Sequence, residues 1–195
     1  MVKINLLKIY NDLLKHYGRQ KWWPIQYGFK PKEFEICVGA ILAQNTNWRN
    51  VEKVLFNLKK HDCVRVRDFS GIKKEKLQKL IQSSGFYRQK AERLKLLGKF
   101  ILSYGNFDKF VRNVKRKDLL KVRGIGSETA DSILLYACEK PYFVIDSYTK
   151  KLLEQFGVIK DNYEDYKKIF ETNLPRDVEL YKEFHALVVV RGKDK

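Results

Sequence analysis

The residues best suited to chemistry lie between Lys117 and Phe156, where a pair of glycines is followed about twenty residues later by a single carboxylate. Gly124 and Gly126 stand between two helical patterns, and a glycine turn that opens a helix exposes backbone N–H groups to which a phosphate can bind. Asp146 opens the next helical pattern and could stabilise positive charge on a sugar during bond cleavage. Together these features predict a turn that binds a nucleic-acid backbone and a carboxylate that carries out the reaction beside it.

The side chains around the glycine turn favour phosphate binding, because they add a cationic group and hydroxyl groups. We expect six residues to contact the backbone: Arg123, Gly124, Ile125, Gly126, Ser127 and Thr129. Both features also have a purely structural alternative. The glycine turn could be an ordinary capped connection, and Asp146 could serve only as the N-cap of the helix that begins at Ser147.

Apolar residues at helical spacing cover most of the chain and predict an all-α protein of roughly ten helices. The expected helices include 3–17, one that starts near Lys32, 89–104, 108–114, Ser127 to about Cys138, 163–173, and Val178 to about Val190. The run from Tyr142 to Ile145 is too short and isolated to build a sheet. Phe86 and Tyr87 are expected to anchor the helix that comes after them, although their rings could instead stack against a nucleic-acid base.

The composition indicates a packed globular protein with a polyanionic partner. The 195 residues are 44% hydrophobic and 13% aromatic, which excludes a disordered chain. Forty Lys and Arg residues against 23 Asp and Glu give a net charge of +17, and the commonest partner of such a basic surface is nucleic acid. A thermophilic or ribosome-associated protein with a solvated basic surface is the alternative.

Targeting segments and metal-binding patterns are not evident in the sequence. It has no secretory signal and no apolar run near the ~18 residues that a membrane span needs, so we expect no membrane association and a cytoplasmic, nucleoid-associated protein. Cys37, Cys63 and Cys138 are far apart, so they suggest neither a disulfide framework nor a metal site. We therefore expect no required cofactor.

Four stretches of the chain resemble one known family. VRGIGSETADSILLYA resembles the helix-hairpin-helix of the endonuclease III superfamily of DNA glycosylases, and VIDSYTKKLL resembles its aspartate segment. AILAQNTNWRNVEKVLFNL and GFYRQKAERL resemble two earlier parts of the same family. The resemblance covers almost the whole chain, and it implies base excision repair by an endonuclease III-like fold of two helical lobes with a DNA groove between them. One lobe would comprise 27–136 and end in the hairpin, and the other 1–26 plus 137–195.

The resemblance also implies the type of reaction. Members with lyase activity carry a lysine in the hairpin, and Glu128 occupies that position here. A carboxylate cannot form the Schiff base that an amine forms, so the resemblance implies a monofunctional glycosylase in which water attacks and Asp146 is catalytic. The alternatives are a bifunctional glycosylase/lyase that uses another lysine, and a non-catalytic helix-hairpin-helix module that only binds DNA.

The resemblance extends to the residues that would handle a flipped base. Gln44 matches the family's gap-filling glutamine, with Asn45 beside it, although both could simply end a helix. The candidate base pocket resembles that of endonuclease III-type 3-methyladenine DNA glycosylases and consists of Trp22, Trp23, Pro24 and Trp48. A π-rich pocket favours a cationic alkylated purine. Alternatively, the first two tryptophans pack one lobe against the other, or the substrate is uracil or thymine opposite guanine, or adenine opposite an oxidised guanine.

The resemblance bears on cofactors and partners as well. Many relatives bind a [4Fe–4S] cluster through four cysteines after the last helix. Here EFHALVVVRGKDK matches that helix, and the sequence ends about where the first cysteine would fall, so we expect no iron–sulfur cluster in this chain as given. Either this member lacks the cluster, as some alkylpurine glycosylases do, or the sequence is truncated there. The resemblance leaves room for a monovalent cation at the hairpin. The expected partner is double-stranded DNA that contains a damaged base, bound by a monomer.

Overall fold

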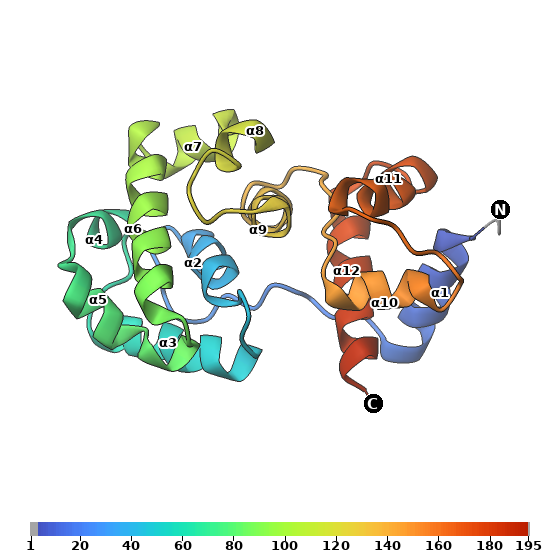
Figure 1. Ribbon diagram of the computed structural model, residues 1–195, viewed down its shortest axis with the longest axis horizontal. Helices are drawn as coiled ribbons and strands as arrows, with labels where there is room; N and C mark the ends of the chain where they lie inside the picture. Colours follow the sequence, from blue (N-terminus) through green and yellow to red (C-terminus); the bar gives the residue numbers. More distant parts are fainter. Residues whose placement is uncertain (1–3, 195) are drawn as a thin grey trace. The chain divides into compact units, whose positions relative to one another are not determined.

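The computed structural model describes residues 4–194, and within that range the protein is all-α, as the periodicity predicts. Those residues form no β-strand, and an isolated bridge pairs Lys30 with Arg65. The chain divides into two compact units (Figure 1). The first unit combines the residues up to Pro24 with those from Leu134 onward, and the second is the continuous segment Ile25–Ile133.

Each unit contains its own set of helices. The first unit contains α1 (Leu6–Tyr17), α10 (Ser147–Glu154), α11 (Tyr163–Asn173) and α12 (Val178–Lys193). The second contains α2 (Phe34–Leu42), α3 (Trp48–Lys60), α4 (Val66–Gly71), α5 (Lys74–Leu80), the 3-10 helix η1 (Gln82–Ser84), α6 (Tyr87–Ser103), α7 (Phe107–Asn113), α8 (Arg116–Leu119) and α9 (Ser127–Ser132). The π-helical segment η2 (Ile133–Ala137) continues α9 and carries the chain from the second unit into the first.

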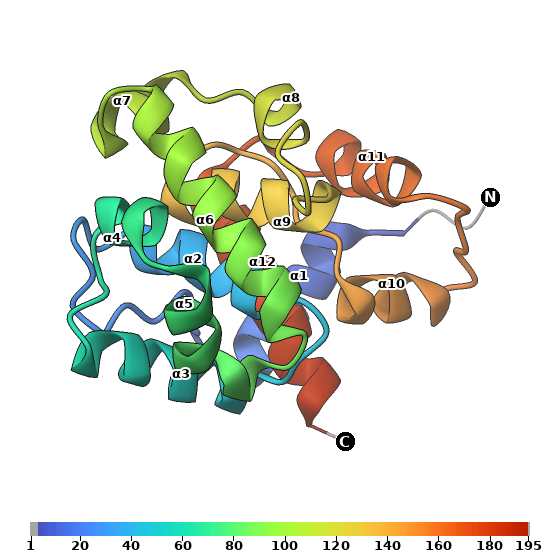
Figure 2. The same ribbon diagram turned by 60° about the vertical axis from the view of Figure 1, so that its left-hand side comes forward.

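The second unit is organised around α6, which Figure 2 brings to the front and which contacts α4, α5 and α2. Gly98 lets α4 approach closely, because a Cβ atom there would lie 3.1 Å from the backbone nitrogen of Ser70 and 3.3 Å from the carbonyl oxygen of Val66. Every residue of α2 is buried, so this helix forms the centre of the apolar core.

Lys90 and Asp131 are charged side chains that are buried in the second unit and have their partners there. The Lys90 ammonium, 1% exposed, donates to the carbonyl oxygens of Leu42 (2.8 Å) and Ser84 (2.7 Å), and burial lowers its pKa to about 8. The Asp131 carboxylate, 0% exposed, is held by the Arg116 guanidinium, with Nε to Oδ1 at 2.7 Å and Nη2 to Oδ2 at 3.2 Å. Because each charge has its partners, neither is an uncompensated buried ion.

The first unit is organised around α12, against which α1 and α10 pack. Its core is a cluster of aromatic rings in which Phe143 stacks on Phe170, with ring centroids 4.1 Å apart, and meets Tyr181 and Phe184 edge-on at 5.2 and 5.9 Å. The cluster fixes the extended segment before Asp146 against α12, since Phe143 lies in that segment.

One expectation about local structure holds only in part, and another is wrong. The helix expected from Ser127 to about Cys138 is α-helical only to Ser132, and the wider π turn comes next, with all of its five side chains buried. Phe86 does not anchor α6, because its side chain is 62% exposed. Its backbone is left-handed, with φ of +44°, a conformation that is rare for a bulky residue.

Candidate active site

Asp146 caps α10, and the cap occupies one of its two carboxylate oxygens. Oδ1 accepts hydrogen bonds from the backbone nitrogen of Thr149 at 2.7 Å and from its hydroxyl at 2.9 Å. The side chain of Asp146 is only 16% exposed. The structural alternative raised by the sequence is therefore present, but it leaves Oδ2 uncommitted to the cap, so capping does not exclude chemistry.

The second oxygen of Asp146 faces a buried histidine from α12. Asp146 Oδ2 lies 3.5 Å from His185 Nε2, and His185 Nδ1 lies 2.7 Å from the hydroxyl of Tyr136 in η2. The ring of Trp23 meets that of Tyr136 edge-on at 5.5 Å, and Trp22 lies 5.9 Å from Trp23. A continuous chain of side chains thus leads from the two tryptophans to the carboxylate.

The surroundings of Asp146 keep it ionised despite its burial. Burial itself raises the pKa of this carboxyl, but the neighbouring His185 and the two hydrogen bonds from Thr149 lower it by more, so the pKa lies below its ordinary value. Burial, together with the charges of Asp146 and Glu183, holds the pKa of Tyr136 well above 10. At neutral pH Tyr136 is a protonated hydroxyl and Asp146 a carboxylate.

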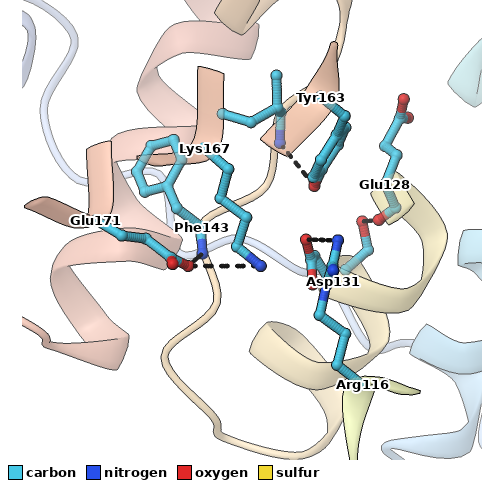
Figure 3. Close-up of polar contacts among 9 residues, drawn as sticks. Arg116, Glu128, Asp131, Phe143, Tyr163, Lys167 and Glu171 are labelled. Carbon is cyan, nitrogen blue, oxygen red and sulfur yellow. Dashed lines mark hydrogen bonds and ion pairs between the residues drawn. The ribbon is translucent and has the colours of Figure 1, made fainter. Parts of the chain in front are cut away.

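Side chains of α11 fix the extended segment that leads to Asp146 (Figure 3). The backbone N–H of Ile145 donates to the Tyr163 hydroxyl at 3.2 Å, and that of Phe143 donates to Oε1 of Glu171 at 2.9 Å. Lys167 lies 3.6 Å from the same oxygen of Glu171. Because an extended segment has no internal hydrogen bonds, these contacts restrict how far Asp146 can move.

The glycine turn has two glycines with different structural demands. Gly124 has φ of +88°, and a Cβ atom there would lie 2.5 Å from Cγ and Nε of Arg93. Gly126, the N-cap of α9, has φ of −90°, and a Cβ atom there would meet nothing within 4 Å. Only the first glycine is therefore required by the fold of the turn itself.

Gln44 is joined by two hydrogen bonds to this turn and the helix that follows it, and by a third to Arg93 of α6. Its Nε2 donates to the carbonyl oxygen of Gly124 at 3.0 Å and to the hydroxyl of Thr129 at 2.9 Å, and its Oε1 accepts from Nη1 of Arg93. The side chain of Thr129 is buried and engaged with Gln44. The structure thus brings the expected gap-filling residue together with the expected backbone-binding turn.

The remaining predicted residues are distributed over both units. Trp22, Trp23 and Pro24 are half-buried and belong to the first unit with Asp146, whereas Trp48 and the exposed Asn45 belong to the second. In the hairpin, the Ile125 side chain is buried, Ser127 is half-buried, and Arg123, 83% exposed, pairs with Glu92 at 3.1 Å. Glu128 is exposed, and its carboxylate is directed away from the Arg116–Asp131 pair (Figure 3).

Sequence reasoning missed three residues of the site. His185 and Tyr136 stand in apolar runs and look like core residues, and their separation of 49 positions hides the contact. Arg93 is one of many basic residues on α6. The one available signal was a lone histidine in the most apolar part of α12, where a buried polar side chain needs a partner.

The described part of the chain contains neither a candidate metal-binding group of side chains nor a candidate membrane-spanning helix. Within residues 4–194, no three His, Cys, Asp or Glu side chains are grouped so that they could hold a metal ion. Over the same range no helix is both long and apolar enough to span a bilayer.

Comparison with known proteins identifies the family. Residues 38–176 match the model of the HhH-GPD superfamily of base excision DNA repair proteins. A protein of Methanocaldococcus jannaschii named "Putative DNA repair glycosylase MJ1434" is 46% identical over 96% of this chain and 87% of its own length. Endonuclease III of Thermotoga maritima is 28% identical over 74% of this chain and 67% of its own length.

A solved structure agrees with this identification. The crystal structure of the H. pylori 3-methyladenine DNA glycosylase MagIII bound to 1,N6-ethenoadenine superposes with a TM-score of 0.86 at 32% identity, over 97% of this chain and 98% of that one. The predicted all-α, endonuclease III-like fold is thereby confirmed. The chain belongs to the HhH-GPD superfamily and is a DNA repair glycosylase whose substrate is DNA with a damaged base.

Proposed function

We propose that this enzyme is a monofunctional glycosylase that removes alkylated purines such as 3-methyladenine. The observation that carries the proposal is the run of rings from Trp22 through Trp23 and Tyr136 to His185, which faces the carboxylate of Asp146. Aromatic faces attract a cationic ring, and a purine alkylated on a ring nitrogen is cationic. The likeness to MagIII, at 32% identity, supports the same class of substrate.

In the proposed reaction Asp146 acts as an anion. As the bond between the sugar C1′ and the base nitrogen breaks, its electron pair leaves with the base, and positive charge builds up on the sugar. The ionised Asp146 stabilises that charge and orients a water molecule, whose oxygen then forms the new bond to C1′ while one of its protons passes to the Asp146 carboxylate. A cationic alkylated purine leaves as a neutral base, so no proton has to be donated to it.

The second unit would supply the DNA contacts. The backbone of Gly124 to Ser127 would bind DNA phosphates, with Arg123 as an exposed cation beside it, and Gln44 would fill the gap that the flipped nucleotide leaves. By resemblance to the family, we assign Asn45 to the DNA wedge and Trp48 to the base pocket. The proposal takes the active protein to be a monomer.

Asp146→Asn tests the role of the carboxylate without disturbing the cap, because asparagine caps a helix as well as aspartate does. Base release should be abolished, whereas DNA binding and the midpoint of thermal unfolding should match those of the parent. Full activity in this variant would refute the mechanism.

The substrate is tested with duplexes that each carry one lesion: 3-methyladenine, 7-methylguanine, uracil, or thymine opposite guanine. We expect release of the alkylated purines. Exclusive release of uracil or thymine would show that the proposed substrate is wrong.

Borohydride treatment of the enzyme together with DNA that contains an abasic site tests the monofunctional mechanism. It should trap no covalent adduct, because Glu128 stands where the lyase lysine would be, and an adduct would favour a bifunctional enzyme.

A further inference from the structure

We infer that His185 is a positioning residue for Asp146, whose Nε2–H holds the free carboxylate oxygen, and that Tyr136 fixes the tautomer of the histidine that makes this possible. The inference rests on the proposed catalytic role of Asp146. It assigns a function to a buried histidine and a buried tyrosine that the cleavage reaction itself does not use.

The two carboxylate oxygens of Asp146 have different neighbours. Oδ1 is engaged twice by Thr149, at 2.7 and 2.9 Å. Oδ2 faces His185 Nε2 at 3.5 Å, which is slightly longer than a hydrogen bond. His185 Nε2 is buried and has no hydrogen-bond partner among residues 4–194, and contacts of this kind in unbound enzymes often shorten when the substrate binds. Oδ2 is therefore the oxygen whose direction the histidine can set.

The proton of a neutral His185 can lie on either ring nitrogen. A neutral histidine carries one proton, and its two nitrogens then differ as donor and acceptor. The Tyr136 hydroxyl, 2.7 Å from Nδ1, stays protonated and can donate to that nitrogen, which leaves the proton of His185 on Nε2, facing Asp146. The opposite tautomer would place the Nε2 lone pair against a carboxylate, which is repulsive.

Several titratable groups surround His185 and its two neighbours, Asp146 and Tyr136. Asp146 at the start of α10 and Tyr136 in η2 face His185 directly, and Glu183 of α12 acts on Tyr136. On α1, burial and the charge of Glu183 raise the pKa of Tyr10. The Tyr136 hydroxyl can instead donate to the carbonyl oxygen of Lys182 at 3.3 Å and then accept from Nδ1, so an imidazolium can donate to both neighbours. In either protonation state a donor faces Oδ2.

Removing the donor should affect both the rate and its pH dependence. Without His185, burial of Asp146 is opposed only by Thr149, so the pKa of Asp146 rises and the acidic limb of the rate profile moves to higher pH. A hydrogen bond to a charged group that is needed for the reaction changes the rate by about 10- to 100-fold. Binding of DNA does not use this contact and should not change.

The experiment compares His185→Phe, which removes the donor, with His185→Gln, whose amide nitrogen can occupy the place of Nε2 and donate but cannot titrate. Base release is measured with enzyme in excess over an alkylated duplex across pH, and DNA affinity is measured separately. His61→Phe, the same exchange at an exposed histidine of the second unit, is the matched control. Asp146→Asn is assayed in parallel.

We expect His185→Phe to lose rate at unchanged DNA affinity with its acidic limb shifted upward, and His185→Gln to keep most of the rate. Parental rate and profile in His185→Phe, with Asp146→Asn inactive, would overturn the inference alone, as would equal losses in both His185 variants. An active Asp146→Asn would overturn the proposed mechanism and the inference with it. If His185→Phe does not fold, Tyr136→Phe decides, because a parental rate profile in that variant contradicts the proposed tautomer.

Discussion

Replacement of the two hairpin glycines by alanine should have opposite consequences for stability. Gly124→Ala places a side chain on a backbone with φ of +88° and sets its Cβ 2.5 Å from Arg93. The left-handed backbone costs about 1–2 kcal/mol for a residue with a Cβ. Moving Arg93 also breaks its charged hydrogen bond to Gln44, a loss of about 1.5–3 kcal/mol when it is complete.

Arg93 is flexible and can recover part of that bond, so we expect Gly124→Ala to lower the free energy of unfolding by about 2–4 kcal/mol. For a chain of this length that corresponds to a fall of roughly 5–15 °C in the unfolding midpoint. Gly126→Ala meets no atom within 4 Å, and alanine restricts the unfolded chain, so this variant should be neutral or stabilised by up to about 1 kcal/mol.

Denaturant unfolding of the two variants beside the parent measures these differences, and the slope with denaturant concentration shows whether the native state has changed. DNA binding at several salt concentrations supplies the functional half of the test. Gly126→Ala should weaken DNA binding while the fold is intact, because the added methyl group occupies the space that the proposed phosphate needs. Equal stability of the two alanine variants would refute the reasoning about Gly124 and Arg93.

Three further predictions concern single side chains. Arg116→Met leaves the fully buried carboxylate of Asp131 without its guanidinium and should cost about 3–5 kcal/mol in denaturant unfolding, whereas Arg123→Met breaks an exposed pair and should cost less than about 1 kcal/mol; similar losses would contradict this. Lys90 has a pKa lowered to about 8 by burial, so the folded state binds this proton less tightly than the unfolded state and stability should rise between about pH 8 and the ordinary lysine value. Lys90→Met should remove that rise, and an unchanged pH dependence would argue against the assignment. Asp146→Ala should lower the free energy of unfolding by about 1 kcal/mol through loss of the cap, while Asp146→Asn leaves it unchanged.

The helices could be predicted because their signals are local. Asn162 and Asp177 cap α11 and α12 through side-chain bonds three residues ahead, so the starts at Tyr163 and Val178 were confirmed. The end of α11 at Asn173 was confirmed as well, two residues before Pro175. Such caps and breakers depend on neighbours in sequence alone.

The remainder depends on contacts between distant parts of the chain. Nothing near Ser132 in the sequence indicates that the helix widens into a π turn there, and the neighbours of Phe86 do not predict its left-handed backbone or its exposed ring. Asp146 was predicted to be a site residue from its type and position. The partner of its second oxygen was not, because His185 comes from another helix 39 positions later (146 to 185).

The chain order of the two units has a consequence for synthesis. The second unit is one uninterrupted segment, Ile25–Ile133, so it can complete its core while the ribosome is still translating the helices of the first unit that come later in the chain. The first unit needs α1 from the beginning of the chain and α12 from near its end. A nascent chain therefore carries the glycine turn and Gln44 long before His185 emerges, and the contact to Asp146 is among the last to form. Premature termination before α12 would release a polypeptide that contains the glycine turn and Gln44, the candidate DNA-binding residues, but lacks His185 beside Asp146.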